Sequence, residues 1–173
     1  MKKIICSILA LLLIAGGSSC KEKIDIEKEK KAIKAVIEEE TVSFIARDYD
    51  RLIANYVQDE TNIRFTADKS GYSYYVGWEE LSSRFRKYFE NNPEPSTDKY
   101  VKDNYKIKVY KESAWVVNDE TVYDPEGNVL FKLIGVRILE KEDDKWKIVF
   151  ISVVNTTSYE VASDEAEEES DAD

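Results

Sequence analysis

Residues 105–157 read YKIKVYKESAWVVNDETVYDPEGNVLFKLIGVRILEKEDDKWKIVFISVVNTT, and this stretch decides the fold. Apolar and polar side chains alternate along it, which is typical of strands that are half buried. The segments DPEG (124–127) and EDDK (142–145) carry residues that favour tight turns. We therefore expect four long strands, joined as an antiparallel meander, at residues 105–111, 113–123, 128–140 and 146–157.

Helical periodicity precedes these strands. Residues 26–46 predict a long amphipathic helix, and Asp48 or Asp50 is expected to cap a short second one. Two short strands at residues 62–67 and 73–76 then lead to a third helix, which begins at Trp78 and ends before Pro93. This order predicts an α+β fold with three N-terminal helices packed in a strongly curved antiparallel or mixed sheet.

The composition excludes several classes of chemistry. The chain has 173 residues, which favours one domain, and no histidine, so Ser-His-Asp triads and histidine-liganded metals are ruled out. The sequence shows no phosphate-binding glycine loop and no ligands at metal spacing, so we expect no cofactor and no metal. A formal net charge of −10 argues against nucleic acid as a partner, because that binding depends on clustered Lys and Arg.

The first twenty residues differ from the rest of the chain. Two lysines precede an apolar run at residues 4–15, which is shorter than the roughly 17 to 25 residues that span a bilayer. A signal peptide at residues 1–19 is therefore expected. Gly17-Ser18-Ser19-Cys20 resembles the lipobox of bacterial lipoproteins, in which the cysteine is acylated. The alternative is secretion with Cys20 as a free thiol.

These features predict a division of the chain. Residues 20–25 are expected to be a tether, residues 26–159 the folded domain, and residues 160–173 an acidic disordered tail, since that segment has eight acidic and no basic side chains. Lipidation at Cys20 would anchor the protein to a membrane of the bacterial cell envelope, facing the periplasm or the exterior.

A family resemblance rests on the order of elements and on two segments, GWEEL at residues 77–81 and DKWKIV at residues 144–149. Together they make residues 26–159 similar to the NTF2-like superfamily, and most of all to its SnoaL-like members. The resemblance implies a cone-shaped fold with an internal cavity. It also implies a homodimer paired through the convex faces of the sheets, here expected at residues 105–111 and 129–139. Catalytic members commonly place a histidine in the cavity, and this chain has Phe150 and Ser152 where the last strand often carries one.

Arg137 is the most specific candidate for a binding site. It resembles a pocket arginine in the calmodulin-kinase association-domain branch of the superfamily. If it points inward, it needs a carboxylate, and Asp119 or Glu120 on the neighbouring strand is the expected partner. If it points outward, it is a solvated strand residue.

Further candidates are aromatic and acidic. Asp119 is the candidate for a catalytic carboxylate with a raised pKa, although a salt bridge or plain exposure explains it as well. The run Glu38-Glu39-Glu40 is interpreted as a solvated helix face. The predicted pocket comprises Arg137, Trp115, Tyr56, Tyr74, Tyr75, Trp78, Phe65 and Ser152.

Three functional hypotheses follow. The first is a lipid-anchored domain that binds a small ligand, anionic if Arg137 faces it, or a protein partner, without catalysis. The second is an isomerase or dehydratase in which Asp119 is the base and Tyr74 or Tyr75 polarises a carbonyl. The third is an association module.

Overall fold

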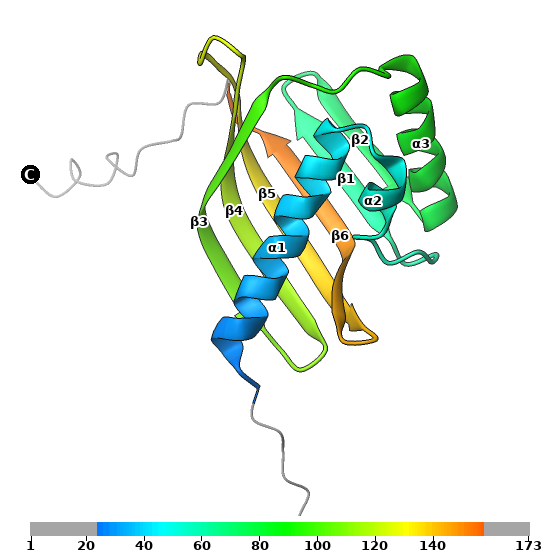
Figure 1. The fold of residues 1–173 in the computed structure, drawn as a ribbon, viewed down its shortest axis with the longest axis vertical. Helices are drawn as coiled ribbons and strands as arrows, with labels where there is room; N and C mark the ends of the chain where they lie inside the picture. Colours follow the sequence, from blue (N-terminus) through cyan, green and yellow to red (C-terminus); the bar gives the residue numbers. More distant parts are fainter. Residues whose placement is uncertain (1–23, 158–173) are drawn as a thin grey trace, which may run out of the picture.

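One long helix leads into a six-stranded sheet (Figure 1). The computed structural model describes residues 24–157. The predicted signal peptide, Cys20 and the predicted acidic tail lie outside these residues, and no helix among residues 24–157 is long and apolar enough to cross a membrane. The elements are, in order, α1 (Ile26–Ile45), α2 (Tyr49–Ile53), β1 (Ile63–Asp68), β2 (Gly71–Val76), α3 (Trp78–Asn91), β3 (Lys99–Val109), β4 (Ser113–Tyr123), β5 (Val129–Glu142) and β6 (Lys145–Asn155).

Capping side chains and buried isoleucines explain the first two helices. The Asp25 carboxylate accepts a hydrogen bond from the backbone N–H of Lys28 at 3.1 Å, which starts α1. Ile33 and Ile37 on α1 are fully buried, as the helical spacing predicted. Of the two candidate caps for α2, Asp48 is the one that accepts a bond from the helix.

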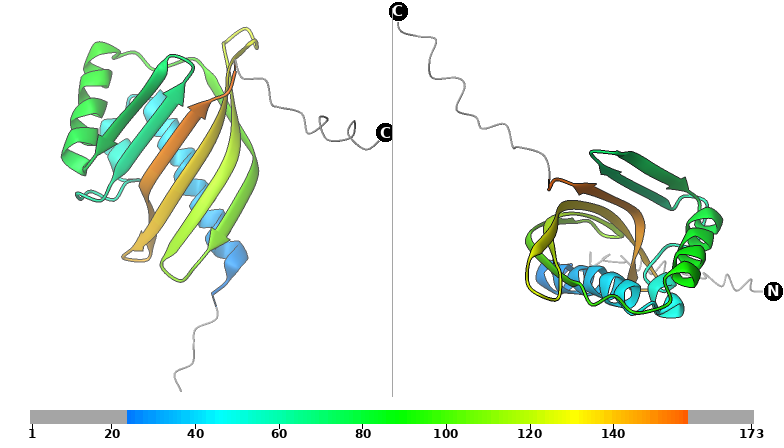
Figure 2. Two further views of the ribbon diagram at one scale, coloured as in Figure 1. Left: turned by 180° about the vertical axis from the view of Figure 1, so that it is seen from behind. Right: turned by 90° about the horizontal axis from the view of Figure 1, so that it is seen from above.

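The sheet is mixed, with strand order β2-β1-β6-β5-β4-β3. Strands β3 to β6 form the predicted antiparallel meander, and β1 pairs in parallel with β6. Figure 2 shows α1 against one face of this sheet and α3 beside the β1–β2 hairpin. We call the face toward α1 the inner face and the opposite one the outer face.

Two parts of the predicted architecture are wrong. The chain has one long helix at its N-terminus, because α2 is five residues long and α3 follows the β1–β2 hairpin. The sheet is also not strongly curled. Its register shifts, which bend strands, lie in the β3–β4, β4–β5 and β5–β6 pairs, whereas β1 pairs in unbroken register with both of its neighbours.

The strand boundaries agree with the prediction within two residues except at the start of β3. This strand begins at Lys99, six residues before the predicted start, because its first half carries charged residues that hide the apolar alternation. Gly77 ends β2 with a φ of 85°, a backbone conformation that favours glycine, and its N–H donates to the Asn62 carbonyl at 2.7 Å. This turn sets the direction of α3.

Candidate functional site

Arg137 is the largest fully buried side chain in the described part of the chain, with 2% of its surface exposed. It points from β5 toward α1. Its Nη1 donates a hydrogen bond to Asn118 Oδ1 at 3.0 Å. Its Nη2 lies 3.8 Å from Glu40 Oε2 and 3.7 Å from Glu120 Oε2. The guanidinium therefore sits between a carboxylate from α1 and one from β4.

A glycine makes room for this guanidinium. Gly135 precedes Arg137 by two residues and lies on the same face of β5. A Cβ atom at position 135 would lie 2.5 Å from Arg137 Nη1 and 3.1 Å from Asn118 Oδ1. The absence of a side chain in the middle of this strand is thus what allows Arg137 to fold back over it.

Glu40 connects the helix to the sheet. It is 6% exposed and accepts a hydrogen bond from the Tyr56 hydroxyl at 2.8 Å. Tyr56 is fully buried, and burial, together with the nearby Glu40 charge, raises its pKa well above the ordinary value. Tyr56 therefore stays protonated and keeps donating to Glu40.

Two more cations complete the group, and one of them pairs with a further carboxylate, Glu38. Arg64 Nη1 on β1 lies 3.9 Å from Glu40 Oε1, and Lys102 Nζ on β3 lies 3.7 Å from Glu38 Oε2. Lys102 is also the ladder partner of Glu120. We refer to Glu40, Arg64, Lys102, Glu120 and Arg137 as the interior charged cluster. Side-chain exposure is 21% for Arg64 and 7% or less for the other four.

The cluster is incompletely paired. Among residues 24–157, Arg64 Nη1, Lys102 Nζ, Arg137 Nε and Glu120 Oε2 find no hydrogen-bond partner. Burial raises the pKa of Glu120, and the charges of Lys102 and Arg137 offset part of this rise. With Glu38, which is paired with Lys102, three cations face three carboxylates, and protonation of Glu120 would leave one excess positive charge.

An open hollow lies close to the cluster, at the end of the sheet where β1 and β6 end. We call it the rim hollow. Its volume is about 390 Å³. Arg64 and Arg137 flank Ile151 on β6, and one ladder step further the rungs continue as Thr66, Val153 and Gly135. Thr66 and Val153 line the hollow, so it begins about 7 Å along the strands from the two arginines. The remaining lining residues are Ala67, Asp68, Ser70, Gly71, Tyr72, Ser73, Leu133 and Asn155.

Half of the predicted pocket lies on the inner side of the sheet. Arg137 belongs to the interior charged cluster, and the Tyr56 hydroxyl donates a hydrogen bond to Glu40 of that cluster. Tyr75 is the ladder partner of Arg64 and packs against the core beneath Arg84, which lies 5.0 Å from its ring centroid. Trp78 packs at the start of α3, with its ring centroid 6.0 Å from that of Tyr56.

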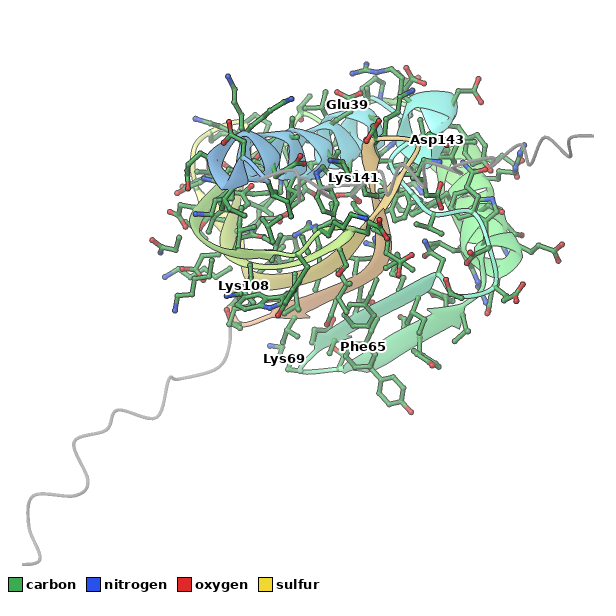
Figure 3. The ribbon with its side chains drawn as sticks, turned by 90° about the horizontal axis from the view of Figure 1, so that it is seen from below. Glu39, Phe65, Lys69, Lys108, Lys141 and Asp143 are labelled. Carbon is green, nitrogen blue, oxygen red and sulfur yellow. The ribbon has the colours of Figure 1, made fainter. Side chains whose placement is uncertain are left out.

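The other half lies on the outer face, and its assignment to a pocket was wrong. Trp115 is 41% exposed and pairs there with Ile138, which is equally exposed. Phe65, Tyr74 and Ser152 are ladder partners on the same face. Figure 3 places Phe65 on the hairpin, on the side of the molecule opposite α1.

Asp119 is also on the outer face. It is exposed and accepts a hydrogen bond from the Asn104 side chain at 2.7 Å. It is therefore neither the partner of Arg137 nor a carboxylate in an apolar pocket, and the catalytic role considered for it loses its basis. The second expected partner, Glu120, is the one that lies beside Arg137.

The sequence analysis missed three members of the cluster. Glu40 lies three residues after Ile37 and seven after Ile33, so it occupies the apolar stripe of α1 rather than a solvated face. That spacing was a usable signal. Arg64 and Lys102 gave none, because each lies in a strand whose buried face the sequence did not identify.

Among the residues that the structure describes, no three His, Cys, Asp or Glu side chains are grouped so as to hold a metal ion. The cluster is instead suited to holding an anion beside fixed guanidinium and ammonium groups.

Comparison with known proteins identifies the fold. No protein-family model and no curated protein sequence matches the chain. Solved structures do match. A protein of unknown function with a cystatin-like fold from Nostoc punctiforme is 17% identical, with 76% of this chain and 93% of that chain covered and a TM-score of 0.60.

Two other neighbours carry the NTF2 designation. An NTF2-like protein of unknown function from Shewanella oneidensis is 17% identical, covering 73% of this chain and 98% of that one at a TM-score of 0.58. A candidate dehydratase of the NTF2-like family from Streptomyces avermitilis is 11% identical, covering 75% and 97% at a TM-score of 0.60. Residues 24–157 therefore have the NTF2-like, cystatin-like α+β fold, as the sequence resemblance implied.

Proposed function

We propose that this protein is a lipid-anchored cell-envelope domain that binds a small anionic ligand without catalysing a reaction. One observation carries the ligand part. Arg64 Nη1, Lys102 Nζ and Arg137 Nε are buried, positively charged donors without a hydrogen-bond partner in the described part of the chain. Leaving such a donor unpaired is costly, and a bound anion would satisfy it.

The ligand class follows from charge and access. A carboxylate matches the guanidinium plane with two hydrogen bonds and carries the charge opposite to that of the three cations in the cluster. Its body would lie in the rim hollow, between Thr66 and Leu133, with its charged end toward Arg64 and Arg137. Absence of catalysis is supported by the missing histidine and by the exposure of Asp119.

The start of α1 and the hollow lie at opposite ends of the domain. Helix α1 has 20 residues, which corresponds to about 30 Å, and its first residue, Ile26, is six residues after Cys20 in the sequence. In Figure 1 the chain enters at the lower end, whereas β1 and β6 both run toward the upper end, where the hollow lies. A tether from Cys20 to Asp25 reaches at most about 17 Å. An anchored domain would therefore present the hollow away from the membrane.

Ligand binding is tested by calorimetry with benzoate and with benzamide, a neutral molecule of the same shape. Benzoate is expected to bind the full chain, and benzamide at least tenfold more weakly. Arg64→Gln should weaken benzoate binding tenfold or more. Arg86→Gln, which changes an exposed arginine on α3, is the matched control and should leave it unchanged. Equal binding of the two ligands, or equal loss in the two variants, would contradict the proposal.

Lipid anchoring is tested separately in cells. Cys20→Ala, or treatment with globomycin, should leave unprocessed or released protein, because no acylated cysteine forms. Unchanged partitioning into the membrane fraction would contradict the anchor and leave the ligand proposal standing.

A further inference from the structure

The two edge strands of the sheet differ in how they are protected. Within residues 24–157, β3 and β2 each pair on one side alone. On β3, Lys106 and Lys108 are exposed, and the register shifts between Asp103 and Lys106. Such charges and bulges keep edge strands from pairing with other chains. β2 reads GYSYYV, with no charge and no proline, and its register with β1 is unbroken.

The edge at β2 is accompanied by exposed aromatic side chains. Tyr72 is 76% exposed and Tyr74 is 55% exposed, both on the outer face. α3 packs on the inner side, where Arg84 covers the ring of Tyr75. The backbone edge of β2 and the outer tyrosines are therefore left for a partner to cover.

We propose that β2 pairs antiparallel with β2 of a second copy of this chain, so that the two sheets join into one. A continuous sheet requires outer-face residues to lie opposite one another. The register centred on Tyr74 satisfies this. It places Tyr74 opposite its counterpart and Tyr72 opposite Val76 of the second copy, which brings aromatic and apolar side chains together without opposing like charges.

Charges beyond the strand select the same arrangement. In this register the turn residue Lys69 of each copy approaches Glu79, at the start of α3, in the other copy. Both side chains are exposed, and neither forms an ion pair within the described residues. The inference uses no residue of the interior charged cluster, and Tyr72 is the outer-face residue of β2 that it shares with the lining of the hollow.

The test uses disulfide trapping in the full chain with Cys6→Ser and Cys20→Ser, in mild detergent. Residues directly opposite in an antiparallel pair have Cα atoms about 4.5 to 5.5 Å apart, a distance that a disulfide spans. Tyr74→Cys should give a covalent dimer on a non-reducing gel. Ile138→Cys, a control on the outer face of β5 that is 41% exposed, should not.

A charge swap tests the register. Lys69→Glu should reduce the trapped dimer severalfold, and adding Glu79→Lys to the same chain should restore it. Trapping at position 138 instead of 74 would show face-to-face pairing and overturn the proposal. Trapping at both positions, at neither, or without any response to the charge swap would overturn it as well.

Discussion

Gly135→Ala probes how closely the chain is built around Arg137. The added Cβ would lie 2.5 Å from Arg137 Nη1, about 1 Å inside ordinary contact distance. Nη1 is held at 3.0 Å by Asn118 Oδ1, so a displacement of that size breaks the hydrogen bond.

The expected loss combines two effects. Overpacking in a filled interior costs about 1 to 3 kcal/mol, and losing a hydrogen bond to a charged group costs about 1.5 to 3 kcal/mol. Relaxation of the guanidinium and the better strand propensity of alanine recover about 1 kcal/mol. We expect Gly135→Ala to lower the free energy of unfolding by about 1.5 to 5 kcal/mol.

Urea unfolding measures this change, and an unchanged m-value verifies that the two-state comparison holds. A double-mutant cycle with Arg137→Met isolates the cause. On the Arg137→Met background the guanidinium is gone, so Gly135→Ala should cost less than about 1 kcal/mol. An equal loss on both backgrounds, or a stabilised Gly135→Ala protein, would refute the reasoning.

Three further predictions concern single side chains. Arg137→Met leaves Glu40 and Glu120 buried without their shared cation and should lower the free energy of unfolding by about 3 to 5 kcal/mol, with partial rescue by Glu120→Gln, both measured by urea unfolding. Because burial raises the pKa of Glu120, the native state holds its proton where the unfolded chain, with a pKa near 4.5, has lost it. The wild-type protein should therefore lose stability relative to Glu120→Gln as pH rises above that value, in thermal unfolding from pH 4 to 8, and a constant difference would argue against a raised pKa. Asp25→Ala removes the cap of α1 and should cost about 1 kcal/mol in urea unfolding, whereas Asp25→Asn should cost little.

The sequence predicts the order of the elements well and the faces of the strands poorly. β5 begins two residues after the turn signal at residues 124–127, and β6 begins at the last residue of the signal at residues 142–145. Val116 and Val117 on β4 show why the faces were missed. Successive apolar residues point to opposite sides, since both faces of this sheet carry apolar side chains. Alternation alone then does not tell which residues face the interior, and Asp119 and Trp115 were predicted on the inner face instead of the outer one.

Contacts between segments that are distant in the sequence explain why Glu40 was not predicted as part of the site. Glu40 on α1 is buried because Tyr56, Arg64 and Arg137 surround it, and these come from the α2–β1 connection, β1 and β5. Local patterns report none of these neighbours. For Arg137 the sequence left two alternatives, a buried side chain paired with a carboxylate and a solvated strand residue, and the structure shows the first.

The central claim is that the interior charged cluster holds an anion, and the Nε–Hε resonance of Arg137 in an NMR titration tests it most directly. This nitrogen is buried and has no hydrogen-bond partner among residues 24–157. On addition of benzoate, we predict a saturable shift of this resonance and slower exchange of its proton with water, with no change on addition of benzamide. An Arg137 resonance that stays in place while those of exposed arginines such as Arg86 move linearly with benzoate would contradict the account.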